Sequence, residues 1–130
     1  MSETQLQDAR NRLEEVGKVY SEACSFSEYC NEDTCQSVDA QGILMTADVI
    51  ENESVDEPAT LSNGYWFGPI DSSEATRTFL YGQSTVILPS YGDRLGILSL
   101  DRATGNARLT LHGTTEHIVE SYIGTCEVQG

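Results

Sequence analysis

Four cysteines carry the clearest chemical signal in this chain of 130 residues. Cys24, Cys30 and Cys35 lie in one short segment, and Cys126 lies near the C-terminal end. An even number of cysteines in a small acidic chain is typical of two disulfide bonds, and four cysteines allow three pairings. The sequence alone does not separate the three. We prefer Cys30 with Cys35, which closes a short loop, and Cys24 with Cys126, which ties the end of an N-terminal helix to the last strand.

Two other states of the cysteines stay open, namely reduced thiols and a zinc site with four thiolate ligands. The spacing C-x5-C-x4-C followed by a distant cysteine differs from the paired C-x2-4-C knuckles that grip one zinc ion. No C-x-x-C pair is present, so a dithiol redox role has little support.

The chain has two histidines, His112 and His117. A turn over residues 113–116 would place them opposite each other in a hairpin, where they and Glu116 could hold zinc or copper. The same register, however, places Leu109 opposite Glu120 and so buries a carboxylate. A loop of three or five residues separates the histidines, and the register stays open.

An acidic segment contains Glu51, Glu53, Asp56 and Glu57, whose oxygens could bind calcium. The spacing lacks the order of an EF-hand loop, which favours a solvated loop. A strained G-x-S-x-G turn and a phosphate-binding glycine loop are also absent from the sequence. The sequence therefore favours a protein that is not an enzyme and that has no cofactor, with zinc or calcium as the alternatives.

An N-terminal helix is expected over residues 2–23, because Ser2 and Gln5 have the form of a capping box and apolar residues recur three and four positions apart. This helix should pack on a sheet. Residues 24–41 follow as a Cys-rich acidic connector. From residue 42 to residue 126 the pattern changes to a period of two, which indicates a β-meander.

The segment Leu95–Gly113 predicts its own hairpin. A turn over residues 103–106 places Leu100 opposite Leu109 and Asp101 opposite Arg108, with the leucines on one face. Asn63-Gly64 predicts a second tight turn. Gly82-Gln83 predicts a third, which would place Phe79 opposite Val86.

These patterns together predict one domain over residues 1–130. Its fold class is α+β and mainly β, with an amphipathic helix followed by an antiparallel meander of six to eight strands. The sheet is either open and covered by the helix or closed into a small barrel.

Tyr65, Trp66 and Phe67 are consecutive, so in a strand they cannot all face the same side. An aromatic side chain that faces outward would form a binding surface, unless the helix covers it. In a barrel that holds a small apolar ligand, Trp66 and Phe79 would line the cavity. The candidate ligand-binding residues are therefore Tyr65, Trp66, Phe67 and Phe79.

The charge of the chain limits its partners. With 21 acidic and 7 basic residues the net charge is −14. This charge argues against nucleic acid and anionic membranes and permits a partner with a basic surface. No run of residues is long and apolar enough for a membrane span.

The segment D-R-x-T-G at Asp101–Gly105 and the late Gly124-Thr125-Cys126 resemble small exported bacterial proteins built from a β-meander with a C-terminal cysteine. The resemblance covers at most the last forty residues. It implies export and the fold, and it assigns no site residues.

The expected function is that of a non-enzymatic exported domain, periplasmic or secreted, which binds or inhibits a protein or surface partner as a monomer or weak dimer. The N-terminus has no signal-like pattern, so an exported form would have lost its signal peptide; the alternative location is the cytosol. Alternative functions are a barrel that binds a small ligand, a metal-binding protein or hydrolase that uses the two histidines, and an acidic mimic of nucleic acid.

Overall fold

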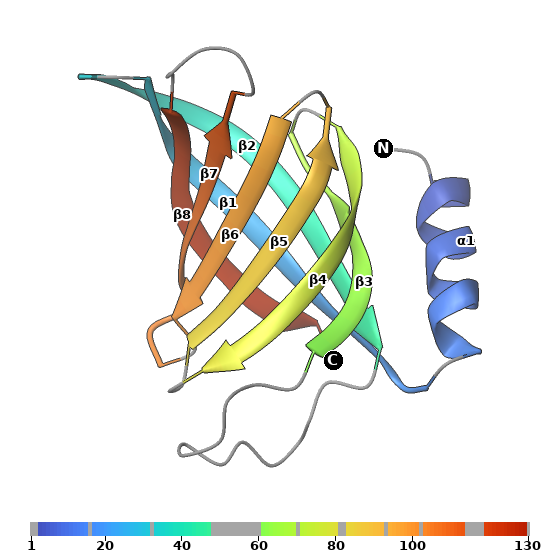
Figure 1. Cartoon of the computed structure of the whole chain (residues 1–130). Coiled ribbons are helices and arrows are strands. Elements are labelled where there is room, and N and C mark those ends of the chain that lie inside the picture. Colours follow the sequence, from blue (N-terminus) through green and yellow to red (C-terminus); the bar gives the residue numbers. More distant parts are fainter. Residues whose placement is uncertain are drawn as a thin grey trace.

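A computed structural model of the chain contains one helix followed by eight antiparallel strands (Figure 1). The structure describes residues 3–15, 17–31, 33–47, 61–69, 71–80, 83–92, 94–101, 103–113 and 119–129. The elements are α1 (Glu3–Glu14), β1 (Val19–Asn31), β2 (Thr34–Ala47), β3 (Leu61–Phe67), β4 (Ser72–Leu80), β5 (Gln83–Tyr91), β6 (Arg94–Asp101), β7 (Asn106–His112) and β8 (Val119–Gln129).

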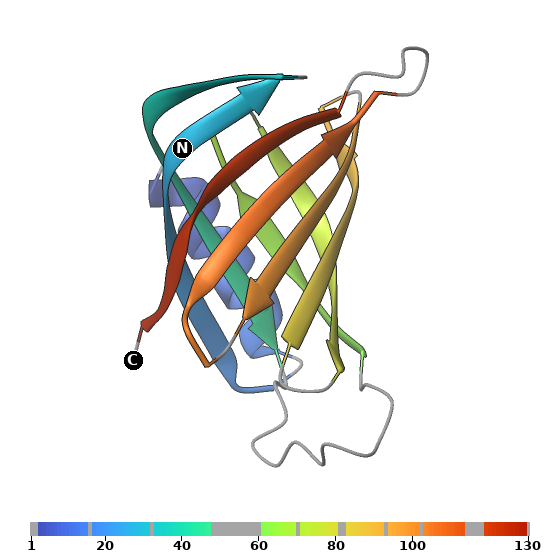
Figure 2. The same cartoon turned by 90° about the vertical axis from the view of Figure 1, so that its left-hand side faces the viewer.

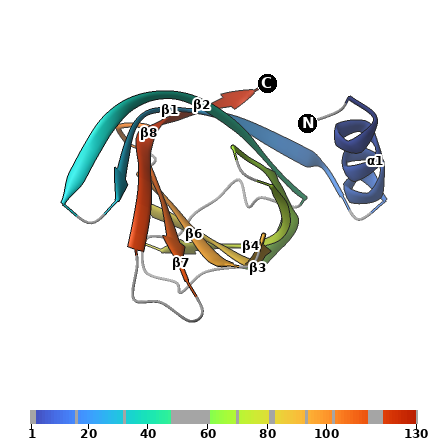
Figure 3. The same ribbon diagram turned by 90° about the horizontal axis from the view of Figure 1, so that it is seen from above.

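Each strand pairs with the next one along the chain, and β8 pairs with β1, so the sheet closes into a barrel (Figure 3). The expected fold class is confirmed, and of the two forms left open by the sequence, the closed barrel is the one that occurs. Among the described residues, no helix has both the length and the apolar character that a membrane crossing requires.

The core fills the interior of the barrel. Successive side chains of a strand lie on opposite faces, so every second residue of each strand points inward. The buried inward-facing side chains form one continuous cluster: Cys24, Phe26, Leu44, Trp66, Ala75, Val86, Leu88, Tyr91, Leu98, Leu100, Ala107, Leu109, Leu111 and Cys126.

The helix forms a second, smaller core on the outside of the barrel. Ala9 and Leu13 pack against Met45, Ala47 and Phe67 of β2 and β3. Figure 1 shows α1 outside the barrel. The helix thus packs on the sheet, as expected, and covers an apolar patch of the outer wall.

The helix is shorter than the predicted range 2–23. It ends at Glu14, and the backbone N–H of Gly17 donates to the carbonyl of Leu13 over 3.1 Å. Tyr20 and Ala23, which extended the apolar pattern, lie in β1. Their spacing fits a helix, but glycine has low helix propensity and the pairing with β2 favours a strand.

The predicted connector over residues 24–41 is also wrong, because these residues form most of β1 and β2. Their polar composition is typical of a loop. It is compatible with strands here because much of this hairpin is exposed on both faces.

The leucine hairpin has the predicted faces but a different register. Leu98 lies opposite Leu109, Leu100 lies opposite Ala107, and Ser99 rather than Asp101 lies opposite Arg108. A slip of two residues leaves every side chain on its original face, so the leucine pattern alone cannot detect it.

The hairpin between β4 and β5 is shifted in the same way. Gln83, predicted in the turn, begins β5 opposite Leu80, and Phe79 lies opposite Ser84 rather than Val86. Here too the shift is two residues, which the alternating pattern tolerates.

The predicted turn at Asn63-Gly64 is wrong, because β3 runs straight through both residues. A Cβ at Gly64 would lie 2.0 Å from the backbone oxygen of Met45. Glycine at position 64 therefore allows β2 and β3 to approach each other closely, and it does not mark a turn.

Candidate functional site

The β1–β2 hairpin extends past β3 at one end of the barrel, while its β1 strand stays paired with β8 as far as Asn31. β1 and β2 have 13 and 14 residues, whereas β3 has 7. β3 pairs with β2 only over Ile43–Thr46, so the hairpin continues past the end of β3 (Figures 1 and 2). Seen from above, it curves away from the barrel (Figure 3). We call residues 25–41 the arm.

A β-bulge sets the direction of the arm. The register of β1 shifts between Phe26 and Glu28 toward both β2 and β8, and a bulge bends and twists its strand. Phe26 and Tyr29 both contact the ring of Tyr122, with ring centroids 5.9 and 5.0 Å away. Because both aromatic rings lie on the inner face, Glu28 and Cys30 are placed on the outer face.

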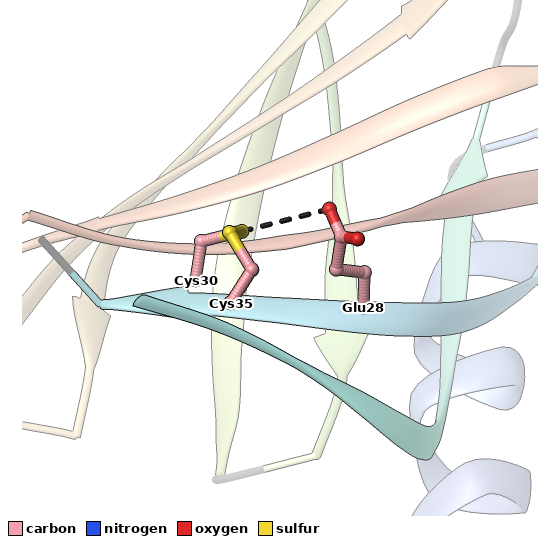
Figure 4. Close-up of side chains that lie close together, drawn as sticks. All are labelled: Glu28, Cys30 and Cys35. Carbon is pink, nitrogen blue, oxygen red and sulfur yellow. Dashed lines mark hydrogen bonds between the residues drawn. A yellow bond between two sulfur atoms is a disulfide. The ribbon is translucent and has the colours of Figure 1, made fainter. Parts of the chain in front are cut away.

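A disulfide bond joins the two strands of the arm near its tip. Cys30 and Cys35 lie directly opposite each other, with Cα atoms 4.1 Å apart. Glu28 Oε1 lies 3.6 Å from Cys30 Sγ (Figure 4). A disulfide sulfur carries no proton, so we interpret this contact as a close approach and not as a hydrogen bond.

Glu28, Cys30 and Cys35 are the one group of metal-ligand residues that lie close together in the described part of the chain. Metals bind cysteine as the thiolate, and both sulfurs are occupied in the disulfide. In the oxidised protein the two cysteines therefore form a covalent cross-link between β1 and β2 and do not offer metal ligands.

The second disulfide joins Cys24 of β1 to Cys126 of β8. The two residues are direct neighbours across the seam where the first and last strands meet, with Cα atoms 4.0 Å apart. Both disulfides are the pairs preferred from the sequence.

The arm is exposed and acidic. Glu28, Asp33 and Asp39 are exposed on it. The sequence contains no lysine or arginine between Lys18 and Arg77, so no cation along this stretch offsets those carboxylates. An exposed region of one charge sign attracts partners of the opposite sign.

The predicted ligand-binding aromatics lie on different sides of the wall. Trp66 points into the barrel and is fully buried, with its ring centroid 6.3 Å from that of Phe26. Phe67 and Tyr65 lie in the outer cluster that α1 covers. The side chain of Phe79 lies outside the described part of the structure. The four residues thus do not form one surface.

A buried charged group lies inside the barrel. Arg77 of β4 is 2% exposed, forms an ion pair with Glu22 of β1 and donates from Nε to Ser84 Oγ over 2.8 Å. The ion pair and the hydrogen bond compensate the cost of burying the guanidinium. This group therefore links β1, β4 and β5 through the interior.

A second ion pair, between Arg94 and Glu120, lies at the barrel end from which the arm projects, close to Tyr29 and Tyr122. Burial raises the pKa of Tyr29, and the nearby Glu120 carboxylate raises it further. Burial also raises the pKa of Tyr122, with smaller contributions from Tyr91 and Glu120. These phenols stay protonated at neutral pH and can donate hydrogen bonds.

Of the registers left open by the sequence, the one that places the two histidines opposite each other does not occur. His112 lies opposite Val119, and Leu111 lies opposite Glu120. Neither the predicted four-residue turn nor the three- and five-residue loops fit, because the strands end at His112 and resume at Val119. Glu116 and His117 lie outside the described residues. The acidic segment from Glu51 to Glu57, for which a solvated loop was favoured over a calcium site, also lies outside them.

Sequence reasoning missed the buried pair Arg77–Glu22 and the pair Arg94–Glu120. One signal was present for Arg77, which shares the inward-facing parity of Ala75 in its strand. The partners themselves are far apart in sequence, so only the closed barrel brings them together.

No protein-family model, curated protein or solved structure matches the chain. Its function must therefore be inferred from its own geometry.

Proposed function

We propose that this protein is a non-enzymatic binding domain that recognises the basic surface of another protein outside the cytoplasm. The observation that carries the proposal is the arm, a disulfide-linked hairpin that extends past β3 and presents exposed carboxylates in a stretch of sequence without lysine or arginine. A pre-organised hairpin loses little conformational entropy on binding, which favours recognition.

Two further observations support this proposal. Large side chains such as Trp66, Tyr91 and Phe26 occupy the barrel interior, which directs recognition to the outside. Both pairs of cysteines form disulfides, and such bonds persist mainly in oxidising compartments such as the periplasm or the extracellular space.

The test uses the oxidised full chain, attached to a resin, and the extracytoplasmic fluid of the organism that makes it. Basic proteins that the resin retains at low ionic strength are identified, purified and titrated with the chain by calorimetry. We expect a stoichiometric complex whose Kd weakens at least about tenfold between about 0.05 and 0.3 M salt.

Matched charge variants locate the contact. Asp33→Asn with Asp39→Asn removes two arm charges, and Glu74→Gln with Glu127→Gln removes two exposed charges elsewhere. We expect the first pair to weaken binding and to reduce its salt dependence more than the second. The proposal fails if no purified candidate binds, or if both pairs have equal effects.

A further inference from the structure

Among the described residues, no strand pairs with the outer edge of the arm. β1 covers one edge of β2 along the arm, but on the other edge β3 reaches only Ile43 among the described residues. The stretch Thr34–Gln41 therefore presents an open sheet edge. Its side chains are exposed or half-buried.

The register shows which backbone groups point outward from this edge. The Cα separation of 4.1 Å between Cys30 and Cys35 is typical of a non-hydrogen-bonded pair in an antiparallel ladder. In such a pair the N–H and C=O groups point away from the partner strand. Cys35 therefore directs its backbone groups to the open edge, and Ser37, two residues further in the same register, does so as well.

Sheet edges of this kind are usually protected by lysine, proline or inward charges, because an open edge can pair with another chain. The sequence of this edge, TCQSVDAQ, has no lysine or proline and only one charged residue, Asp39. The disulfide at its end holds the hairpin in place. The edge is thus pre-organised, and its regular part is Thr34–Ser37, because the register with β1 shifts at Val38 and Asp39.

We propose that an extended segment of the protein partner, rich in lysine or arginine, pairs with Thr34–Gln41 as an additional β-strand. This inference rests on the proposed function and specifies its mode of recognition. Main-chain hydrogen bonds to the edge supply affinity, and side chains of the added strand supply specificity.

Charge identifies the occupant. Asp33 and Asp39 are exposed on β2 or just before it, and residues 19–76 contain no basic side chain. Lysine or arginine in the added strand would face these carboxylates. A second copy of this chain would instead bring the same acidic arms together, and like charges across strands are destabilising.

The probe is a peptide of about ten residues that alternates lysine with valine and threonine, long enough to cover the edge. Ser37→Pro removes an N–H that points outward and leaves the hydrogen bonds to β1 in place. Ser37→Ala keeps the N–H and serves as the matched control. We expect the peptide to bind the wild type and Ser37→Ala equally and Ser37→Pro at least tenfold more weakly.

Amide hydrogen exchange of the wild type gives a readout that does not depend on a variant. The amides of Cys35 and Ser37 should become protected when the peptide binds. Absence of peptide binding at millimolar concentration, equal binding to Ser37→Pro, or protection only outside Thr34–Gln41 would overturn strand addition.

Two outcomes separate this inference from the proposed function. A purified natural partner that binds the wild type and Ser37→Pro equally would overturn strand addition and leave the proposed function in place. A failure of every basic partner to bind the wild type would remove both. Self-association that Ser37→Pro abolishes would show that the occupant is a second copy and would overturn the choice of a basic partner.

Discussion

Gly42 of β2 lies against the indole ring of Trp66 in β3, so closely that a Cβ at position 42 would lie 2.3 Å from the ring atom Cη2. This contact lies immediately beyond Ile43, the last residue of β2 that pairs with β3. The only tryptophan of the chain is therefore packed beneath the point at which the arm leaves the barrel.

Substitution of Gly42 by alanine should destabilise the protein by about 1–3 kcal/mol, because a rigid ring in a filled core cannot move aside. Chemical unfolding followed by the fluorescence of Trp66 measures this change. Gly96→Ala is the matched control, since its Cβ would meet the more flexible side chain of Leu88 at 3.1 Å. Equal destabilisation by both substitutions would contradict the proposed role of the indole ring.

Arg77→Met should cost about 3–5 kcal/mol, because it leaves the Glu22 carboxylate without its partner. The double variant Arg77→Met with Glu22→Leu should be more stable than either single variant, since both charges are then absent. Urea unfolding of the four proteins in this double-mutant cycle gives the coupling energy. A coupling energy near zero would show that the pair does not act as a unit.

Removal of the two disulfides should have unequal effects. Cys24 and Cys126 are 102 residues apart, whereas Cys30 and Cys35 are 5 apart. The chain-entropy model assigns about 4–5 kcal/mol to the long closure and about 2 kcal/mol to the short one. Paired replacement by alanine, followed by denaturant unfolding, checks the order, and a larger loss for the Cys30–Cys35 pair would contradict it.

The stability of the barrel should fall at alkaline pH. The pKa values of Tyr29 and Tyr122 are raised in the folded state, mainly by burial, so the folded protein binds these phenol protons more tightly than the unfolded chain. The stabilising contribution is complete below pH about 10 and is lost as the pH rises through the folded pKa values.

Stability measured against pH for the wild type and for Tyr29→Phe with Tyr122→Phe tests this expectation. The double variant should lose less stability than the wild type above pH about 10. Identical slopes in the two proteins would show that these phenols do not contribute.

Much of the fold could be predicted because alternation and cysteine spacing are local signals. The leucines of β6 and β7 identify the inner face, and the even number of cysteines predicts two disulfide bonds, whose observed pairing is the preferred one of the three possible. Register was harder to predict. Shifts of two residues preserve each face, so the alternating pattern could not place Leu98 opposite Leu109.

The candidate site was less accessible to prediction. The arm is rich in polar residues, which are typical of a loop. Its strand character depends on the pairing of β1 with β2 on one side and with β8 on the other. The edge of Thr34–Gln41 is open because β3 is short. The residues of the edge itself therefore carry no signal that predicts it. Sequence did indicate the acidic character of the region and the cysteines that staple it.

The bond between Cys24 and Cys126 also changes the connectivity of the chain. It joins the first strand to the last, so the eight strands form a covalent ring as well as a hydrogen-bonded one. A single backbone cut anywhere between these two cysteines opens the ring without dividing the molecule. A protease that nicks the chain there would leave two fragments that migrate as one species until a reductant separates them.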